Sequence, residues 1–199
     1  MKTFEEYLAD AERAHGHLCA GQILGVRLAM HGLRLLGIDD PYGEDRKRLV
    51  TFVEIDRCAT DAVAVVTGCR LGKRALKFRD FGKVAATFID LASGRAVRVL
   101  ARESSREKAR SAYPDIPDKD QQQAAAYRAM DDSELFEHQW VRVELPPEEL
   151  PGYKGEPVTC EQCGERISFR REVRRDGRLL CRACAGQRYY TPIRVMSDK

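Results

Sequence analysis

The spacing of apolar side chains predicts three helices in the first third of the chain. Residues 3–14 form a polar helix with apolar positions on one face, and residues 20–36 form a longer helix that ends at Gly37. Residues 59–68 predict a short, almost entirely buried helix that Gly68 closes.

Apolar, β-branched runs predict four strands, at residues 49–55, 84–89, 95–101 and 138–145. Two polar helices, at residues 105–113 and 118–136, are expected between the last two strands. Because strands and helices do not alternate regularly, the pattern indicates an α+β fold, a small sheet with flanking helices, rather than a doubly wound parallel sheet.

A segment rich in proline and glycine, PPEELPGYKGEP at 146–157, predicts a linker, since proline at this density disfavours both helices and central strands. It separates a core domain, residues 1–145, from a small module, residues 158–199. No apolar run reaches the ~18 residues that span a bilayer, and the N-terminus lacks the apolar segment of a signal peptide. We therefore expect a cytoplasmic protein that does not interact with membranes.

The strongest local motif is a pair of CxxC sequences separated by seventeen residues. This spacing is typical of four thiolates around one structural zinc ion. The hairpin signal Asp176-Gly177 between the two pairs completes the pattern of a treble-clef finger, similar to the C4 fingers of DksA/TraR-like proteins. The alternative is four unrelated buried or redox cysteines. The predicted zinc ligands are Cys160, Cys163, Cys181 and Cys184.

The charge of the chain, +3 overall, is concentrated in this module. From Pro157 to Lys199, ten Lys and Arg stand against five Asp and Glu, a net +5, whereas the preceding residues carry −2. The module's arginines could contact nucleic acid, although a solvated hairpin face has the same composition. These are Arg166, Arg170, Arg171, Arg174, Arg175, Arg178 and Arg182.

A second group of metal-ligand residue types lies between the first two helices. In an extended segment His15, His17 and Cys19 project to one side, and Cys19 precedes the second helix, where free amides favour a thiolate. Cys58, at the junction of a buried strand and a helix, is expected to be acidified in the same way. Asp61, one helical turn later, could cap its own helix or orient an imidazole.

Two chemistries are open for these residues. His17, Cys19 and Cys58 could hold a transition metal such as zinc with one open position, or Cys58 could act as a thiolate nucleophile with His17 as its base. Cys58 could also be simply a small buried residue. Our candidate catalytic residues are His17, Cys19, Cys58 and Asp61, and His15 is the candidate cofactor-binding residue.

Three blocks resemble the FmdE family, which is named after the FmdE subunit of molybdenum formylmethanofuran dehydrogenase. They are HGHLCAGQILGVRLA, VEIDRCATDAVAVVTGCRLGK and FGKVAATF, in the family's order within residues 10–145. The resemblance implies a homodimeric α+β core with a pocket that contains the same five residues, and some members carry a C-terminal treble-clef finger. Ala20 stands where the family commonly has proline.

The resemblance favours a metal- or thiol-dependent enzyme or accessory subunit in one-carbon metabolism, associated with molybdenum or tungsten oxidoreductase subunits. A nucleic-acid- or polymerase-binding regulator and an interaction scaffold without chemistry are the alternatives. The sequence contains no dinucleotide fingerprint and no paired catalytic carboxylates, and GCRLGK at 68–73 lacks the spacing of a phosphate-binding loop.

Overall fold

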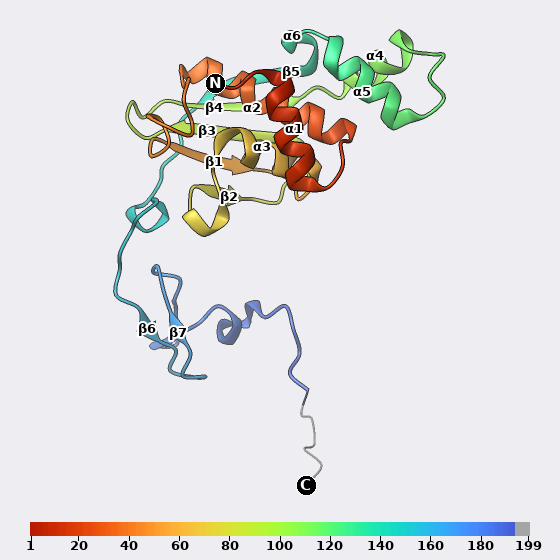
Figure 1. Ribbon diagram of the computed structural model, residues 1–199. Coiled ribbons are helices and arrows are strands. Elements are labelled where there is room, and N and C mark those ends of the chain that lie inside the picture. Colours follow the sequence, from red (N-terminus) through yellow and green to blue (C-terminus); the bar gives the residue numbers. More distant parts are fainter. Residues whose placement is uncertain (194–199) are drawn as a thin grey trace. The chain divides into compact units, whose positions relative to one another are not determined.

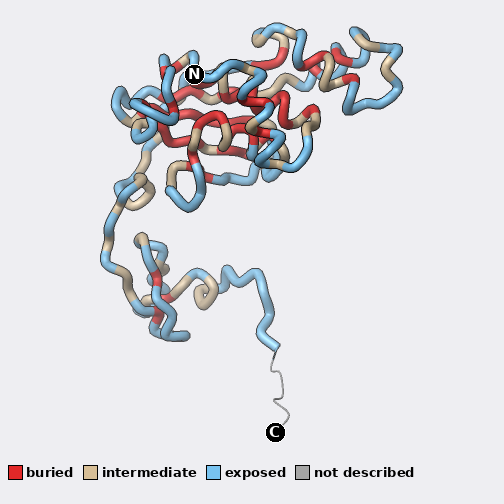
Figure 2. The backbone as a smooth tube through the Cα atoms, in the orientation of Figure 1, coloured by how far each residue is buried: buried red, intermediate tan, exposed pale blue. Residues whose placement is uncertain are grey.

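The structure, a computed structural model, describes residues 1–193. It divides into two compact units, Met1–Glu144 and Leu145–Lys199, each with its own hydrophobic cluster. Figure 2 shows the buried residues concentrated in the strands and helices of the first unit, with short buried stretches in the second. Among the described residues, no helix combines the length and the apolar character needed to cross a bilayer.

The first unit is built on a five-stranded sheet in the order β2-β1-β3-β4-β5 (Figure 1). Neighbouring strands run antiparallel except β1 and β2, which are parallel. A largely antiparallel sheet with packed helices confirms the predicted α+β fold. The strands are β1 (Leu49–Val53), β2 (Leu76–Phe78), β3 (Ala85–Asp90), β4 (Ala96–Ala101) and β5 (Phe136–Val141).

The three helices predicted in the first third of the chain are confirmed to within one residue at each end. The predicted helix 118–136 is divided into two: Met130 adopts an extended conformation that ends α5, and Asp131 is the N-cap of α6, with a capping box. The helices are α1 (Phe4–His15), α2 (Ala20–Leu36), α3 (Cys58–Thr67), α4 (Ser104–Ala112), α5 (Lys119–Ala129) and α6 (Asp132–Leu135).

Two differences in the sheet have a tertiary cause. Strand β2 was not predicted, because three residues after a 3-10 turn (Leu71–Lys73) are too short for a periodic pattern and depend on pairing with β1. The last strand is β5 rather than residues 138–145. It pairs with β4 from Phe136, opposite Ala101, to Val141, opposite Ala96, so its length is set by its partner.

Helices α2 and α3 pack in close contact, because small residues face each other. A Cβ built on Gly25 would lie 2.6 Å from the carbonyl oxygen of Ala59 and 2.8 Å from the Cβ of Ala62. No side chain larger than hydrogen fits there without moving a helix. This contact brings the N-terminal ends of α2 and α3 together.

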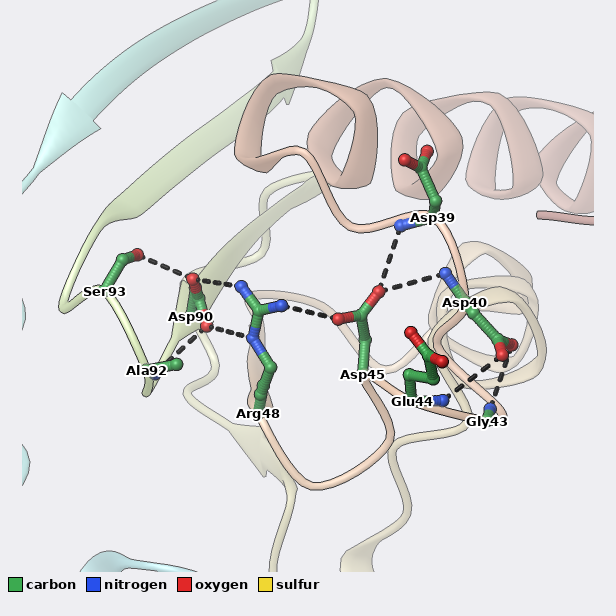
Figure 3. Close-up of polar contacts among 9 residues, drawn as sticks. All are labelled: Asp39, Asp40, Gly43, Glu44, Asp45, Arg48, Asp90, Ala92 and Ser93. Carbon is green, nitrogen blue, oxygen red and sulfur yellow. Dashed lines mark hydrogen bonds and ion pairs between the residues drawn. The ribbon is translucent and has the colours of Figure 1, made fainter.

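A polar network joins the loop after α2 to the end of β3 (Figure 3). Arg48 donates from Nε and Nη2 to the Asp90 carboxylate at 3.0 and 2.7 Å, and Ser93 and the Ala92 amide donate to the same carboxylate. Arg48, helped by Ser93 and Ala92, holds the pKa of Asp90 well below its usual range, although burial acts in the opposite direction.

The network continues on the other side of the guanidinium. Arg48 Nη1 donates to Asp45 at 2.6 Å, and Asp45 in turn accepts from the amides of Asp39 and Asp40 at 3.1 and 3.0 Å. The buried carboxylates of Asp45 and Asp90 lie on the two sides of the Arg48 guanidinium and therefore fix the loop against the sheet.

The second unit holds two small antiparallel pairs, β6 (Val158–Thr159) with β7 (Arg166–Ile167) and β8 (Val173–Arg175) with β9 (Arg178–Leu180). Asp176 and Gly177 join β8 and β9 with positive φ values of 51° and 75°, as the predicted tight hairpin requires. A short, irregular helical turn, Ala183–Gln187, carries the last cysteine. The preceding segment, predicted as a linker, contains a 3-10 turn at Pro147–Glu149.

We expect Gly25→Ala to destabilise the protein by about 1–3 kcal/mol in urea unfolding, because overpacking outweighs the better helix propensity of alanine. The control is Gly72→Ala, whose added Cβ meets nothing within 4 Å and should change stability by less than about 0.5 kcal/mol. Equal stability of the two variants would show that α2 and α3 can separate without cost.

We expect the Asp90 network to make stability acid-sensitive. A carboxyl whose pKa is depressed on folding stabilises the protein above its unfolded pKa of about 3.9, and this contribution is lost as the pH falls from about 5 towards the native pKa. Asp90→Asn should cost about 1–2 kcal/mol at pH 7, and the difference from wild type should shrink at pH 3. The exposed Asp115→Asn is the control, and a pH-independent difference would contradict this explanation.

Candidate metal sites

The four cysteines of the second unit converge on one point. The ligand atoms of Cys160, Cys163, Cys181 and Cys184 all lie within 4.8 Å of one another, and Cys163 Sγ is 3.9 Å from Cys181 Sγ. Four thiolates around one tetrahedral zinc ion are separated by about 3.8 Å, given Zn–S bonds of ~2.3 Å. The arrangement is therefore that of a zinc finger, with four protein ligands and no open position for substrate.

Backbone amides surround these sulfurs. The Cys181 amide donates to Cys160 Sγ at 3.2 Å, and with the Cys163 and Gln162 amides it lowers the pKa of Cys160 to about 6. The pKa of Cys163 is raised: the Glu165 amide lowers it, but burial and the neighbouring thiols outweigh this effect. Amide donors that stabilise a thiolate are what a metal–thiolate centre needs around its ligands.

The second candidate site forms where α1 ends. His15 is the last residue of α1, and Gly16 caps the helix with φ 95°, a conformation that residues with a Cβ rarely adopt. The chain then turns sharply towards α2. As a result the ligand atoms of His15, His17 and Cys19 all lie within 4.8 Å of one another, and the two imidazole centroids are 4.8 Å apart. We call these three residues the core His/Cys cluster.

Asp61 orients one imidazole of this cluster. His15 Nδ1 lies 2.9 Å from Asp61 Oδ2, so of the two roles open for Asp61 from the sequence, the structure shows contact with an imidazole. Arg57 is the N-cap of α3, without a side-chain cap hydrogen bond. An Nδ1–H that donates to a carboxylate leaves the Nε2 lone pair for a metal ion, as in many metal-bound histidines.

Cys58 lies beside Cys19, at the point where α2 and α3 meet. A Cβ built on Gly21 would lie 3.6 Å from Cys19 Sγ and 3.8 Å from Cys58 Sγ. The expected acidification of Cys58 is wrong: burial and the hydrogen-bonded Cys19 thiol raise the pKa of Cys58. These effects outweigh the amides at the start of α3, so Cys58 is protonated at neutral pH in the absence of a bound cation.

The cluster differs in membership from the expected metal set of His17, Cys19 and Cys58. His15 belongs to the three-residue group, and Cys58 adjoins it through Cys19. Two imidazoles and a thiol suit a borderline transition-metal ion such as zinc, and separations within 4.8 Å approach the spacing of ligands around one ion. The donor set of the core His/Cys cluster therefore fits a metal with an open coordination position.

Two further residues at this site were not found by sequence reasoning. Both carboxylate oxygens of Asp120, from α5, lie 3.4 Å from the Ala20 amide at the start of α2, where Cys19 provides no side-chain cap. Gln22 is fully buried and donates from Nε2 to the Cys58 carbonyl oxygen at 2.8 Å. Asp120 is a hundred residues from Ala20 in the sequence, so no local pattern connects them.

A cavity of about 530 Å³ adjoins the site and shares residues with it. Its lining includes three candidate residues, His15, Cys58 and Asp61. The other lining residues come from the end of β1, the start of α3, the 3-10 turn and β2, and they are Val53, Asp56, Arg57, Thr60, Leu71, Leu76 and Phe78. Sequence reasoning did not identify this cavity, because its lining includes residues of the unpredicted strand β2.

The remaining cysteine lies outside both sites. Cys69 is buried and its Sγ lies 3.5 Å from Thr51 Oγ1, in the hydrophobic core of the first unit. His31 also lies apart, 3.2 Å from Asp132 and with its ring 5.6 Å from that of His138. Cys69, His31 and His138 therefore belong to neither of the two candidate metal sites.

Comparisons with known proteins agree with this arrangement. The family profile described as "FmdE, Molybdenum formylmethanofuran dehydrogenase operon" matches residues 14–140, and the profile described as "Prokaryotic dksA/traR C4-type zinc finger" matches residues 153–190. The first match contains the core His/Cys cluster, and the second contains all four zinc-finger cysteines.

Two individual proteins are similar over most of this chain, one in a sequence comparison and one in a structure comparison. A "Probable S-adenosyl-L-methionine-binding protein" from Archaeoglobus fulgidus is 31% identical over 204 residues, covering 92% of this chain and 53% of the relative, so the chain spans about half the length of that relative.

A crystal structure of a protein from Syntrophus aciditrophicus, similar to the FmdE subunit of tungsten formylmethanofuran dehydrogenase, matches with a TM-score of 0.62 and 20% identity, covering 96% of both chains. At this identity the likeness supports the fold. The two profile matches show that the chain belongs to the FmdE family and carries a C4-type zinc finger in its C-terminal unit.

Proposed function

We propose that this protein is a two-metal member of the FmdE family, with a structural zinc ion in the finger and a reactive transition-metal ion at the core His/Cys cluster. The observation that carries the proposal is the convergence of His15, His17 and Cys19, with Asp61 hydrogen-bonded to His15. A carboxylate behind a histidine ligand is a common second partner in metal sites.

The side chains at this site have different roles. Asp61 accepts from His15 Nδ1 and so leaves the Nε2 lone pair to bind a metal ion. A zinc-like ion held by His15, His17 and Cys19 would supply Lewis-acid activation of a water or carbonyl. Cys58 lies next to Cys19 and lines the adjoining cavity, where its thiol can donate a proton to a reacting atom. A thiolate nucleophile with His17 as its base is the alternative role for this thiol.

The metabolic context comes from the family. The description of the family and the name of the similar solved protein both contain formylmethanofuran dehydrogenase. We therefore propose an enzyme or accessory subunit in one-carbon metabolism that works with a molybdenum or tungsten oxidoreductase. A homodimer and a cytoplasmic location remain predictions from the sequence.

The proposal predicts about two metal ions per chain, one for each set of ligands. Replacing Cys160 and Cys163 with serine should remove one ion, and His17→Ala with Cys19→Ser should remove the other. The exposed His138→Ala is the control and should retain both. Elemental analysis of the purified full chain by mass spectrometry measures the content.

A single ion that disappears with the finger cysteines would contradict the core metal site. Only chemistry based on the Cys58 thiol would then remain. Loss of both ions in the His17 and Cys19 variant would indicate unfolding, which circular dichroism of the same sample detects.

The charge of the finger supports a second candidate function, binding of nucleic acid. All seven arginines named for this module are exposed, and they lie on or beside the β7, β8 and β9 strands. Exposed guanidinium groups on one small unit are the electrostatic pattern of phosphate contacts.

This second candidate predicts DNA or RNA binding that weakens steeply as salt increases, because each phosphate contact releases counterions. Replacing Arg170, Arg171, Arg174 and Arg175 with glutamine should abolish it, whereas replacing Arg106 and Arg110, on α4, should not. Fluorescence anisotropy with labelled oligonucleotides measures both. Absent or salt-independent binding would exclude the regulator function.

A further inference from the structure

The residues that line the cavity beside α3 are of two chemical kinds. Those from β1, β2 and the 3-10 turn are apolar, and they are Val53, Leu71, Leu76 and Phe78. Those from the end of α1 and the start of α3 include the candidate site residues His15 and Cys58. A volume of about 530 Å³ lies within the usual range of small-molecule sites, ~300–1,000 Å³.

The apolar residues that line the cavity are incompletely covered by the protein itself. Leu71 is 66% exposed and Phe78 is 38% exposed, although both face the cavity. Burial of apolar surface stabilises a complex by about 25 cal/mol per Å². A ligand with an apolar body would therefore gain affinity from contact with these two side chains.

The residues around the cavity provide no excess of positive charge. Asp56 and Arg57 contribute one charge of each sign, and the Asp61 carboxylate accepts a hydrogen bond from His15. Thr60 already donates its hydroxyl hydrogen to the Ile55 carbonyl oxygen. This lining provides no excess of cations for a polyphosphate, so it favours a neutral or singly charged ligand.

His15 belongs both to the core His/Cys cluster and to the cavity lining. Cys58 also lines the cavity, and its thiol contacts that of Cys19. We infer that the cavity is the substrate site of the core metal centre. It takes a small organic molecule with an apolar body, held by Leu71 and Phe78, and an oxygen-donor head group directed to the cluster. The inference rests on the proposed metal function and adds the class of substrate.

Two probes with the same head group test the inference. Acetohydroxamate and benzohydroxamate both present two oxygen donors to a metal, but only the second has an aromatic ring. With the zinc-loaded full chain, isothermal titration calorimetry should give at least about tenfold tighter binding of benzohydroxamate, as burial of roughly 60 Å² of ring surface provides. His17→Ala with Cys19→Ser should abolish binding of both probes.

Surface variants locate the aromatic ring. Leu71→Ser and Phe78→Ser should each reduce the preference for benzohydroxamate towards a ratio of about one while leaving acetohydroxamate affinity unchanged. The matched control is Phe81→Ser, because Phe81 is 65% exposed and lies three residues from Phe78 but does not line the cavity. Leu71 is more exposed than Phe78, so its variant remains informative if Phe78→Ser impairs folding.

The outcomes separate the two proposals. Equal affinity for both probes overturns the cavity inference and leaves the metal site standing. A benzohydroxamate preference that survives both Leu71→Ser and Phe78→Ser places the ring elsewhere and also overturns the inference. If neither probe binds, the inference fails, and the zinc content of the same sample shows whether the core metal site has failed with it.

Discussion

The candidate site depends on the contact between α2 and α3. Gly25 lies so close to Ala59 that an added methyl group would overlap the carbonyl oxygen, and the adjacent turn of α2 carries Gly21 against Cys19 and Cys58. Two helices at this separation place their first turns side by side. Because each first turn begins with a cysteine or follows one directly, backbone packing decides that the two thiols meet.

The two sites of the protein use cysteine in opposite ways. In the finger, four thiols surround a point from which other ligands are excluded, and amides such as that of Cys181 support the thiolates. In the core, the His/Cys cluster has fewer donors, adjoins a cavity, and has beside it a thiol whose pKa is raised. A small unit with a minimal hydrophobic cluster depends on its metal for stability, whereas the core is stabilised by its own packing.

Some buried charged groups of the core stabilise its structure and are not part of the candidate site. Asp90 is enclosed by Arg48, Ser93 and a backbone amide, so it serves as a fixed anchor for the loop before β1. Glu54, at the other end of β1, receives two hydrogen bonds from Arg98 at 2.7 and 2.6 Å. Both ends of β1 are therefore held by carboxylate–guanidinium pairs, which keeps the strand that leads to Cys58 in a defined position.

The sequence by itself determined the features that depend on neighbouring residues: the helices that start near Phe4, Ala20 and Cys58, the α+β class, the Asp176-Gly177 hairpin and the four-cysteine spacing. Periodicity, capping and turn chemistry act within a few residues, so they can be read from the chain. Tertiary structure alone decided that strand β2 forms, that Asp120 meets Ala20, that Asp61 pairs with His15, and that the pKa of Cys58 rises. The physical reason is that strand pairing, burial and hydrogen bonds across 46 or 100 residues arise only when distant segments pack together.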